Sequence, residues 1–153
     1  MKNFLAFLAV PFGLFAGCLA LPVAAPAQGL TIGQAKPAIE QGVATAVAAM
    51  KTHGMVGIEM TVQGCYLHVP TGGLSLSLLR CLGEDTAGLR FAEGGYEAKH
   101  FPIPPYFAMP AFHARAMTEL ARHGVTAPAA VSNTMNHVMT IADAAMIRDT
   151  KPQ

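Results

Sequence analysis

Two segments of this 153-residue sequence combine histidine with methionine, a pairing that suits soft metal ions. Met117 follows His113 by four residues, and Met139 follows His137 by two. A thioether with an imidazole is a donor set that Cu(I) accepts in an exported protein. On a helix, His113 and Met117 share a face, whereas His137 points away from Met139. We expect methionines in the core, histidines on the surface and no cofactor. The alternative is a periplasmic copper carrier that uses these four residues.

The acids offer one neighbouring pair, Glu84 and Asp85. A glycoside hydrolase needs two carboxylates that converge on one bond, and adjacent side chains on a helix diverge. We expect one of the two to be solvated and Asp85 to bond to the backbone or an arginine. No G-x-S-x-G, H-E-x-x-H, C-x-x-C or phosphate-binding glycine motif occurs. The sequence therefore predicts a non-enzyme; the alternative is a hydrolase built on Glu84, Asp85 and a distant histidine.

The amino-terminal 27 residues have the pattern of a signal peptide. Lys2 precedes an apolar run over residues 4–21, and Ala25 and Ala27 form an A-x-A cleavage site. We therefore predict that residues 28–153 are the mature domain, in the periplasm or secreted. In one alternative Cys18 is lipidated and anchors a lipoprotein; in another the apolar run is kept as a membrane anchor. Without either anchor, no membrane contact is expected after cleavage.

Composition narrows the classes of partner. The chain has 10 basic and 9 acidic residues, and only 12% of its residues are charged. Nucleic-acid binding needs a basic surface, which this balance does not supply. A chain of this length forms one domain. An unknown protein partner is the remaining expectation.

The mature chain keeps two cysteines, Cys65 and Cys81. In an oxidising compartment two cysteines predict one disulfide. Closing a loop of about 15 residues stabilises a domain by roughly 3 kcal/mol. The same pairing makes a catalytic thiolate improbable, because an oxidised cysteine is no nucleophile.

Three helices are predicted, over residues 31–54, 110–124 and 128–147. The first begins at a capping box formed by Thr31 and Gln34 and ends at a glycine suited to a left-handed stop. The second and third each have a proline in the first turn, where its missing N–H costs nothing. These segments indicate helices at both ends of the mature chain.

Residues 55–82 fit two patterns. Apolar residues alternate from Val56 to Val62 as on a strand, while Ile58, Val62 and Cys65 also fit one helix face. We predict a mainly α-helical domain of about five helices with one disulfide, which then joins two antiparallel helices. The alternative is an α+β domain in which residues 55–82 form a β-hairpin.

The segment 101–107 contains three prolines and three aromatic residues. Prolines stiffen the chain and reduce the entropy lost on binding. Phe101, Tyr106 and Phe107 are therefore candidate anchors for a protein partner. The interpretation that we favour is structural: a connector between helices pins these rings onto the helices it joins.

The combination of Cys65-Tyr66, Cys81-Leu82, Asp85 and Pro104-Pro105-Tyr106-Phe107, followed by an arginine-bearing helix, resembles small helical periplasmic proteins of proteobacteria. These include the immunity proteins that guard against secreted cell-wall amidases. The resemblance covers about 50 residues and implies an all-α fold. It carries over no functional residue. Together with the missing catalytic motifs, it predicts an exported non-enzymatic binding or protective protein of the bacterial envelope, of the immunity or inhibitor type.

Overall fold

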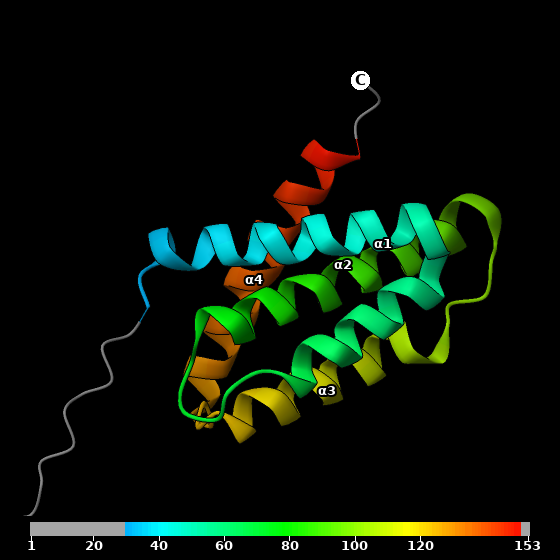
Figure 1. Ribbon diagram of the computed structural model, residues 1–153. Helices are drawn as coiled ribbons and strands as arrows, with labels where there is room; N and C mark the ends of the chain where they lie inside the picture. Colours follow the sequence, from blue (N-terminus) through cyan, green and yellow to red (C-terminus); the bar gives the residue numbers. More distant parts are fainter. Residues whose placement is uncertain (1–29, 151–153) are drawn as a thin grey trace, which may run out of the picture.

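The computed structural model describes residues 30–150, which form helices joined by short connections (Figure 1). The mainly α-helical class is confirmed, and no strand occurs over residues 30–150, so the alternative β-hairpin at residues 55–82 is wrong. The predicted signal peptide and Cys18 lie outside the described residues. The elements, in chain order, are α1 (Ile32–Leu67), α2 (Leu76–Lys99), the 3-10 turn η1 (Pro105–Phe107), α3 (Met109–Arg122) and α4 (Pro128–Asp149).

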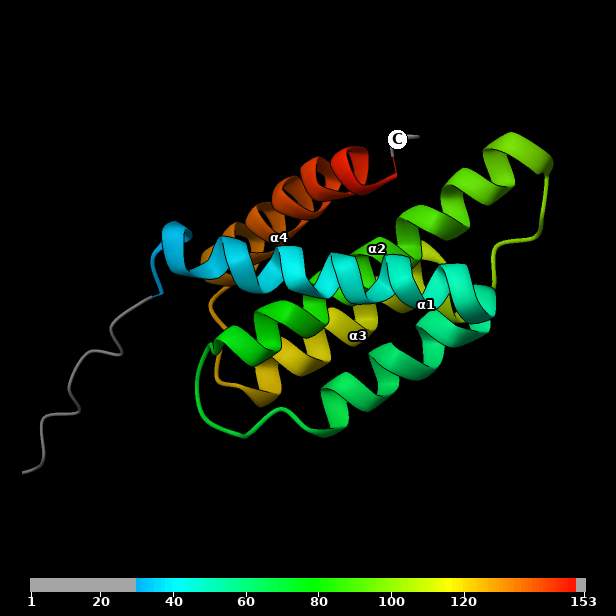
Figure 2. The ribbon, with the colours of Figure 1, turned by 45° about the horizontal axis from the view of Figure 1, so that its top comes forward.

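The first helix bends sharply at Gly54, which has φ 63° and ψ −154°. Only glycine adopts such a conformation without strain. The predicted boundary at Gly54 is therefore a kink, and α1 continues to Leu67. Figures 1 and 2 show the second half of α1 running back from the bend. Because α1 is one kinked helix, residues 30–150 contain four α-helices, where about five were expected.

Local signals explain where α1 starts and which way its second half faces. Thr31 is the N-cap, and its side chain and that of Gln34 complete the predicted capping box. Beyond the kink Ile58, Val62 and Cys65 are buried. The helical interpretation of residues 55–67 is thus confirmed, because these residues lie on one face at intervals of three and four.

Two glycines allow α1 and α2 to cross at close range. A Cβ added to Gly42 would meet the backbone of Arg80 and Glu84, and one added to Gly83 would meet the backbone of Ile39. Neither position has room for a side chain. The crossing therefore brings the two helix backbones together and covers the side of α2 that carries Glu84.

The predicted disulfide is present and joins the second half of α1 to α2. The Cα atoms of Cys65 and Cys81 are 5.5 Å apart, within the range that a disulfide spans. Both cysteines are buried. Since α2 also crosses the first half of α1, it contacts both halves of the kinked helix, and the disulfide fixes it to the second.

The last two helices pack beside this α1–α2 unit. Both start with a proline in the first turn, as expected, and Gly124 between them has a positive φ of 78°. Phe112 and Leu120 of α3, with Val131 and Val138 of α4, complete the core. None of the helices over residues 30–150 combines the length and apolar composition needed to cross a lipid bilayer.

Candidate functional site

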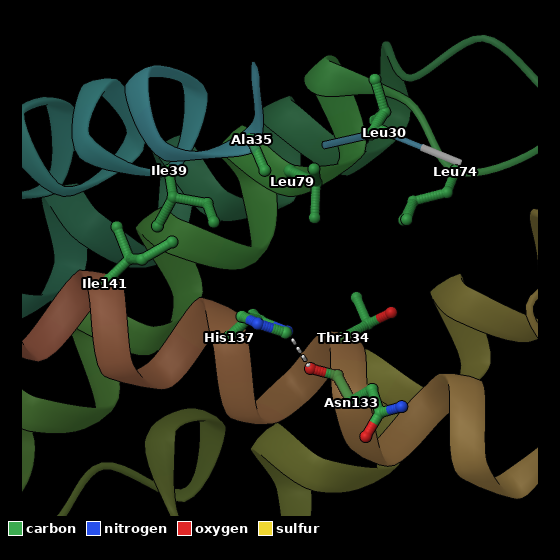
Figure 3. A pocket seen from close by; sticks show the side chains of 9 residues that line it. All are labelled: Leu30, Ala35, Ile39, Leu74, Leu79, Asn133, Thr134, His137 and Ile141. Carbon is green, nitrogen blue, oxygen red and sulfur yellow. Dashed lines mark hydrogen bonds between the residues drawn. The ribbon is translucent and has the colours of Figure 1, made fainter. Parts of the chain in front are cut away.

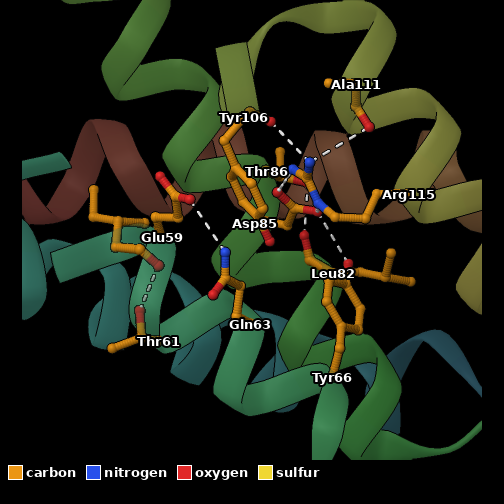
Figure 4. A network of polar contacts seen from close by, with 11 residues as sticks. Glu59, Thr61, Gln63, Tyr66, Leu82, Asp85, Thr86, Tyr106, Ala111 and Arg115 are labelled. Carbon is orange, nitrogen blue, oxygen red and sulfur yellow. Dashed lines mark hydrogen bonds and ion pairs between the residues drawn. The ribbon is translucent and has the colours of Figure 1, made fainter. Parts of the chain in front are cut away.

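Arg115 on α3 reaches into the core and pairs with Asp85 on α2 (Figure 4). Its Nη2 donates to Asp85 Oδ1 at 2.5 Å, and its Nε donates to Asp85 Oδ2 at 3.0 Å. The Asp85 side chain is wholly buried. A two-pronged bond from a planar guanidinium fixes both distance and orientation. Arg115 therefore forms its ion pair inside the protein with Asp85, while its neighbour on the helix, Glu119, lies 3.6 Å from Arg122.

Tyr66 completes the buried end of this network. Its hydroxyl donates to Asp85 Oδ2 at 3.2 Å. Burial, and then the neighbouring Asp85 charge, raise the pKa of Tyr66 well above its usual value, so the phenol stays protonated and keeps donating. Burial also raises the pKa of Asp85, while the bonds from Arg115 and Tyr66 act in the opposite direction. The expected bond between Asp85 and an arginine is thus confirmed, and its role is to join helices.

The other side of Arg115 holds the proline-rich connector. Arg115 Nη1 donates to the carbonyl oxygen of Tyr106 at 2.8 Å. The guanidinium also lies over the Tyr106 ring, with its central carbon 3.7 Å from the ring centroid. Burial is the main cause that raises the pKa of Tyr106 to about 12. One arginine therefore fixes both the backbone and the ring of a residue in the connector.

A shallow pocket opens beside this network, between the end of α1, Tyr106 and the second half of α3. Leu67 stands at its edge with 76% of its surface exposed, and Tyr106 is half-buried. We call this region the Tyr106 surface, defined by the pocket-lining residues Gln63, Tyr66, Leu67, Tyr106, Arg115, Glu119 and Arg122.

The three predicted aromatic anchors have different environments. Phe107 is wholly buried, and its ring fills the space that a side chain at position 88 would occupy. It is a core residue and is not available to a partner. Phe101 is 59% exposed and lies under the Lys99 ammonium group at the end of α2. Tyr106 alone of the three belongs to the Tyr106 surface.

Glu84 is buried, so the expected solvated acid is absent from this pair. Its Oε1 is 3.9 Å from Arg80 Nε, and its Oε2 has no hydrogen-bond partner in the described chain. Burial raises the pKa of Glu84 to about 7. Asp85 turns instead towards Tyr66 and Arg115. The two carboxylates therefore have separate environments and do not form a pair that converges on a substrate.

The histidines and methionines divide between two pockets. His113 and Met117 of α3 line a groove together with Met135 and Met139 of α4. His137 instead lines a pocket on the opposite side of α4, where its Nδ1 lies 2.9 Å from the carbonyl oxygen of Asn133 (Figure 3). Across residues 30–150 no three His, Cys, Asp or Glu side chains cluster as metal ligands. The groove between α3 and α4 thus brings thioethers from both helices together with the His113 imidazole.

Comparison with known protein families, with curated proteins and with solved structures found no match to this chain.

Sequence reasoning named Asp85 and Tyr106 but missed the residue that connects them. Arg115 is separated from Asp85 by 30 positions, and its i+4 neighbour Glu119 offered a local partner. The signal that could have identified it is its place on α3, where the buried Phe112 and Ala116 lie three positions before and one after it. An arginine beside such an apolar face needs a buried acid.

Proposed function

We propose that this protein is an exported, non-enzymatic binding protein of the inhibitor or immunity type, and that it contacts a protein partner through the Tyr106 surface. The observation that carries the proposal is the contact of Arg115 with both the ring and the carbonyl of Tyr106. Together with the buried ring of Phe107, this contact holds the connector in one conformation.

Rigidity matters because binding loses free energy when side chains and loops become ordered. Each rotamer-rich side chain that is immobilised costs about 0.5 to 1.5 kcal/mol. The Tyr106 ring is already fixed by Arg115, so a partner meets it in its bound orientation. Tyrosine and arginine are also the residue types most often found at the centre of strong interfaces.

The neighbouring side chains supply the remaining features of an interface. Leu67 offers exposed apolar area, while Gln63 and Arg122 provide polar groups at the rim. A hydrophobic centre with a polar margin is the usual arrangement of protein contact surfaces. The mechanism we propose is occlusion, in which Tyr106 and Leu67 enter a partner's cleft while the disulfide-bonded helices keep the surface rigid.

The test compares matched baits made from the mature chain. The parent, Leu67→Asp and Tyr96→Ala are each used to capture proteins from the envelope fraction. Leu67 and Tyr96 are both exposed, but Tyr96 lies on α2 outside the Tyr106 surface. We expect a protein captured by the parent and by Tyr96→Ala to be lost with Leu67→Asp.

The captured protein is then purified and its affinity measured against parent and Tyr106→Ala. Loss of a central aromatic anchor costs 2 kcal/mol or more, about thirtyfold in Kd. Circular dichroism shows whether each variant is folded. Equal binding by folded Leu67→Asp, Tyr106→Ala and the parent would overturn the proposed surface.

A further inference from the structure

The groove between α3 and α4 carries soft donors on both helices, four of them in two pairs. His113 and Met117 are four residues apart on α3, and Met135 and Met139 are four apart on α4. Residues at this spacing lie on one face of a helix. All four line the same groove.

We propose that this groove binds one Cu(I) ion through the thioethers of Met117, Met135 and Met139 and the imidazole of His113. Thioether sulfur selects soft ions such as Cu(I), and imidazole is compatible with copper. The inference is independent of the partner surface proposed above, because the two sites share no residue.

Access to solvent distinguishes these methionines from ordinary core residues. Met117 is 38% exposed, Met139 is half-buried and Met135 is buried. A methionine that only filled the core would be enclosed like Met135. An incoming ion can therefore reach the exposed thioether of Met117 first and the buried one of Met135 last. Phe112 and Val131 form apolar walls of the groove.

The state of the histidine rings supports the same choice of ligands. Over the described residues no hydrogen bond engages the ring of His113, whereas His137 Nδ1 is held by the carbonyl oxygen of Asn133. His113 is also exposed. Its nitrogens are therefore available to a metal. The ligand set predicted from the sequence changes accordingly: Met135 enters it, and His137 leaves it because it faces the pocket on the other side of α4.

The groove also excludes the common hard cations. Its lining contains no carboxylate: besides the residues already named, it consists of Met109, Thr126, Pro128, Ser132 and Asn136. Ca²⁺ and Mg²⁺ require several oxygen ligands, usually with carboxylates among them. A neutral, sulfur-rich groove favours a soft monovalent ion instead.

The first experiment uses the mature protein with its disulfide intact. NMR follows the methionine methyl signals as Ag(I) is added. Ag(I) is a soft monovalent ion that does not change oxidation state during the titration. We expect the signals of Met117, Met135 and Met139 to shift and those of Met60 and Met146 to stay. If no methionine signal shifts, or all shift alike, the site does not exist.

The second experiment measures Cu(I) affinity without oxygen by competition with a coloured chelator. Three changes are compared: Met117→Leu with Met139→Leu, the matched control Met60→Leu with Met146→Leu, and His137→Ala. Since even outer-shell changes at metal sites cost about tenfold or more, we expect the first double variant to lose at least that factor. The control and His137→Ala should bind as the parent does. Equal affinity of both double variants would overturn the proposal, and thermal unfolding confirms that each is folded.

Discussion

Asp85 and Arg115 are 30 positions apart in the sequence and are joined by two hydrogen bonds inside the protein. The carboxylate is fully buried, and the guanidinium continues from it to the carbonyl and ring of Tyr106. This pair therefore connects the centre of α2 to the connector that precedes α3. Its loss should affect both the stability of the domain and the position of Tyr106.

Arg115→Ala should destabilise the domain by about 3 to 5 kcal/mol, because it leaves the buried Asp85 charge without its ion-pair partner. Urea unfolding followed by circular dichroism measures this change. Arg148→Ala is the control, since Arg148 pairs with Glu40 and Asp149 at the exposed surface. It should leave the unfolding midpoint almost unchanged. Similar midpoints for both variants would contradict a structural role of the buried pair.

Replacing both cysteines, Cys65→Ser with Cys81→Ser, should lower the free energy of unfolding by about 3 kcal/mol. The bond closes the loop between α1 and α2, and without it the unfolded chain gains conformational freedom. Chemical reduction of the parent should have a similar effect. A double variant that unfolds at the parent's urea concentration would show that helix packing alone holds α1 to α2.

The stability of the parent should fall between pH 5 and pH 8 because of Glu84. Its pKa is raised by burial from 4.5 to about 7, so folding favours the protonated form. The stabilisation from that proton is fully present below pH 4.5 and is lost as the pH rises through 7. A shift of one pKa unit corresponds to about 1.4 kcal/mol of stability. Because water reaches the half-exposed Arg80 beside Glu84, we expect a loss of stability smaller than the full shift implies, ~2 kcal/mol.

Glu84→Gln separates this effect from the titration of other groups. The amide keeps the shape of the protonated acid but cannot ionise. Urea unfolding of parent and variant at both pH values should show a smaller decrease for Glu84→Gln. An identical decrease in the two proteins would mean that Glu84 does not titrate in this range.

Gly88→Ala should destabilise the domain by about 2 kcal/mol, because the new methyl group would overlap the buried ring of Phe107. Gly94→Ala is a matched control on the same helix, with no atom near its added Cβ. Alanine there should stabilise α2 by up to about 1 kcal/mol. Thermal unfolding distinguishes the two. If both changes raise the midpoint, the Phe107 ring has room to move and the connector is less firmly packed than described.

Much of the helical framework could be predicted from local patterns. The capping box at Thr31 and the prolines that start α3 and α4 act within one or two turns, so their effect can be inferred without knowledge of the rest of the chain. Residues 55–82 remained ambiguous for the same reason. Their apolar spacing suits a strand and a helix equally, and only the packing of α1 and α2 against each other resolves that choice.

The candidate sites depended much more on long-range contacts. Glu84 was expected in solvent, yet the close crossing at Gly42 and Gly83 covers it. Phe107 was one of three candidate anchors, and only the space that Gly88 leaves shows that its ring belongs to the core. Neither burial has a local signature, because each depends on which glycine on one helix faces which residue of another element.

The order of residues along the chain therefore determined the helices at both ends of the described chain, the capping box at Thr31, a break at Gly54 and the pairing of Cys65 with Cys81, because short-range geometry and the count of cysteines suffice for these. Tertiary packing decided that Arg115 joins Asp85 and Tyr106 and that Met135, not His137, faces Met117 across the groove. Which side chains meet depends on how each helix is rotated about its axis relative to its neighbours. The sequence of a single helix does not specify that rotation.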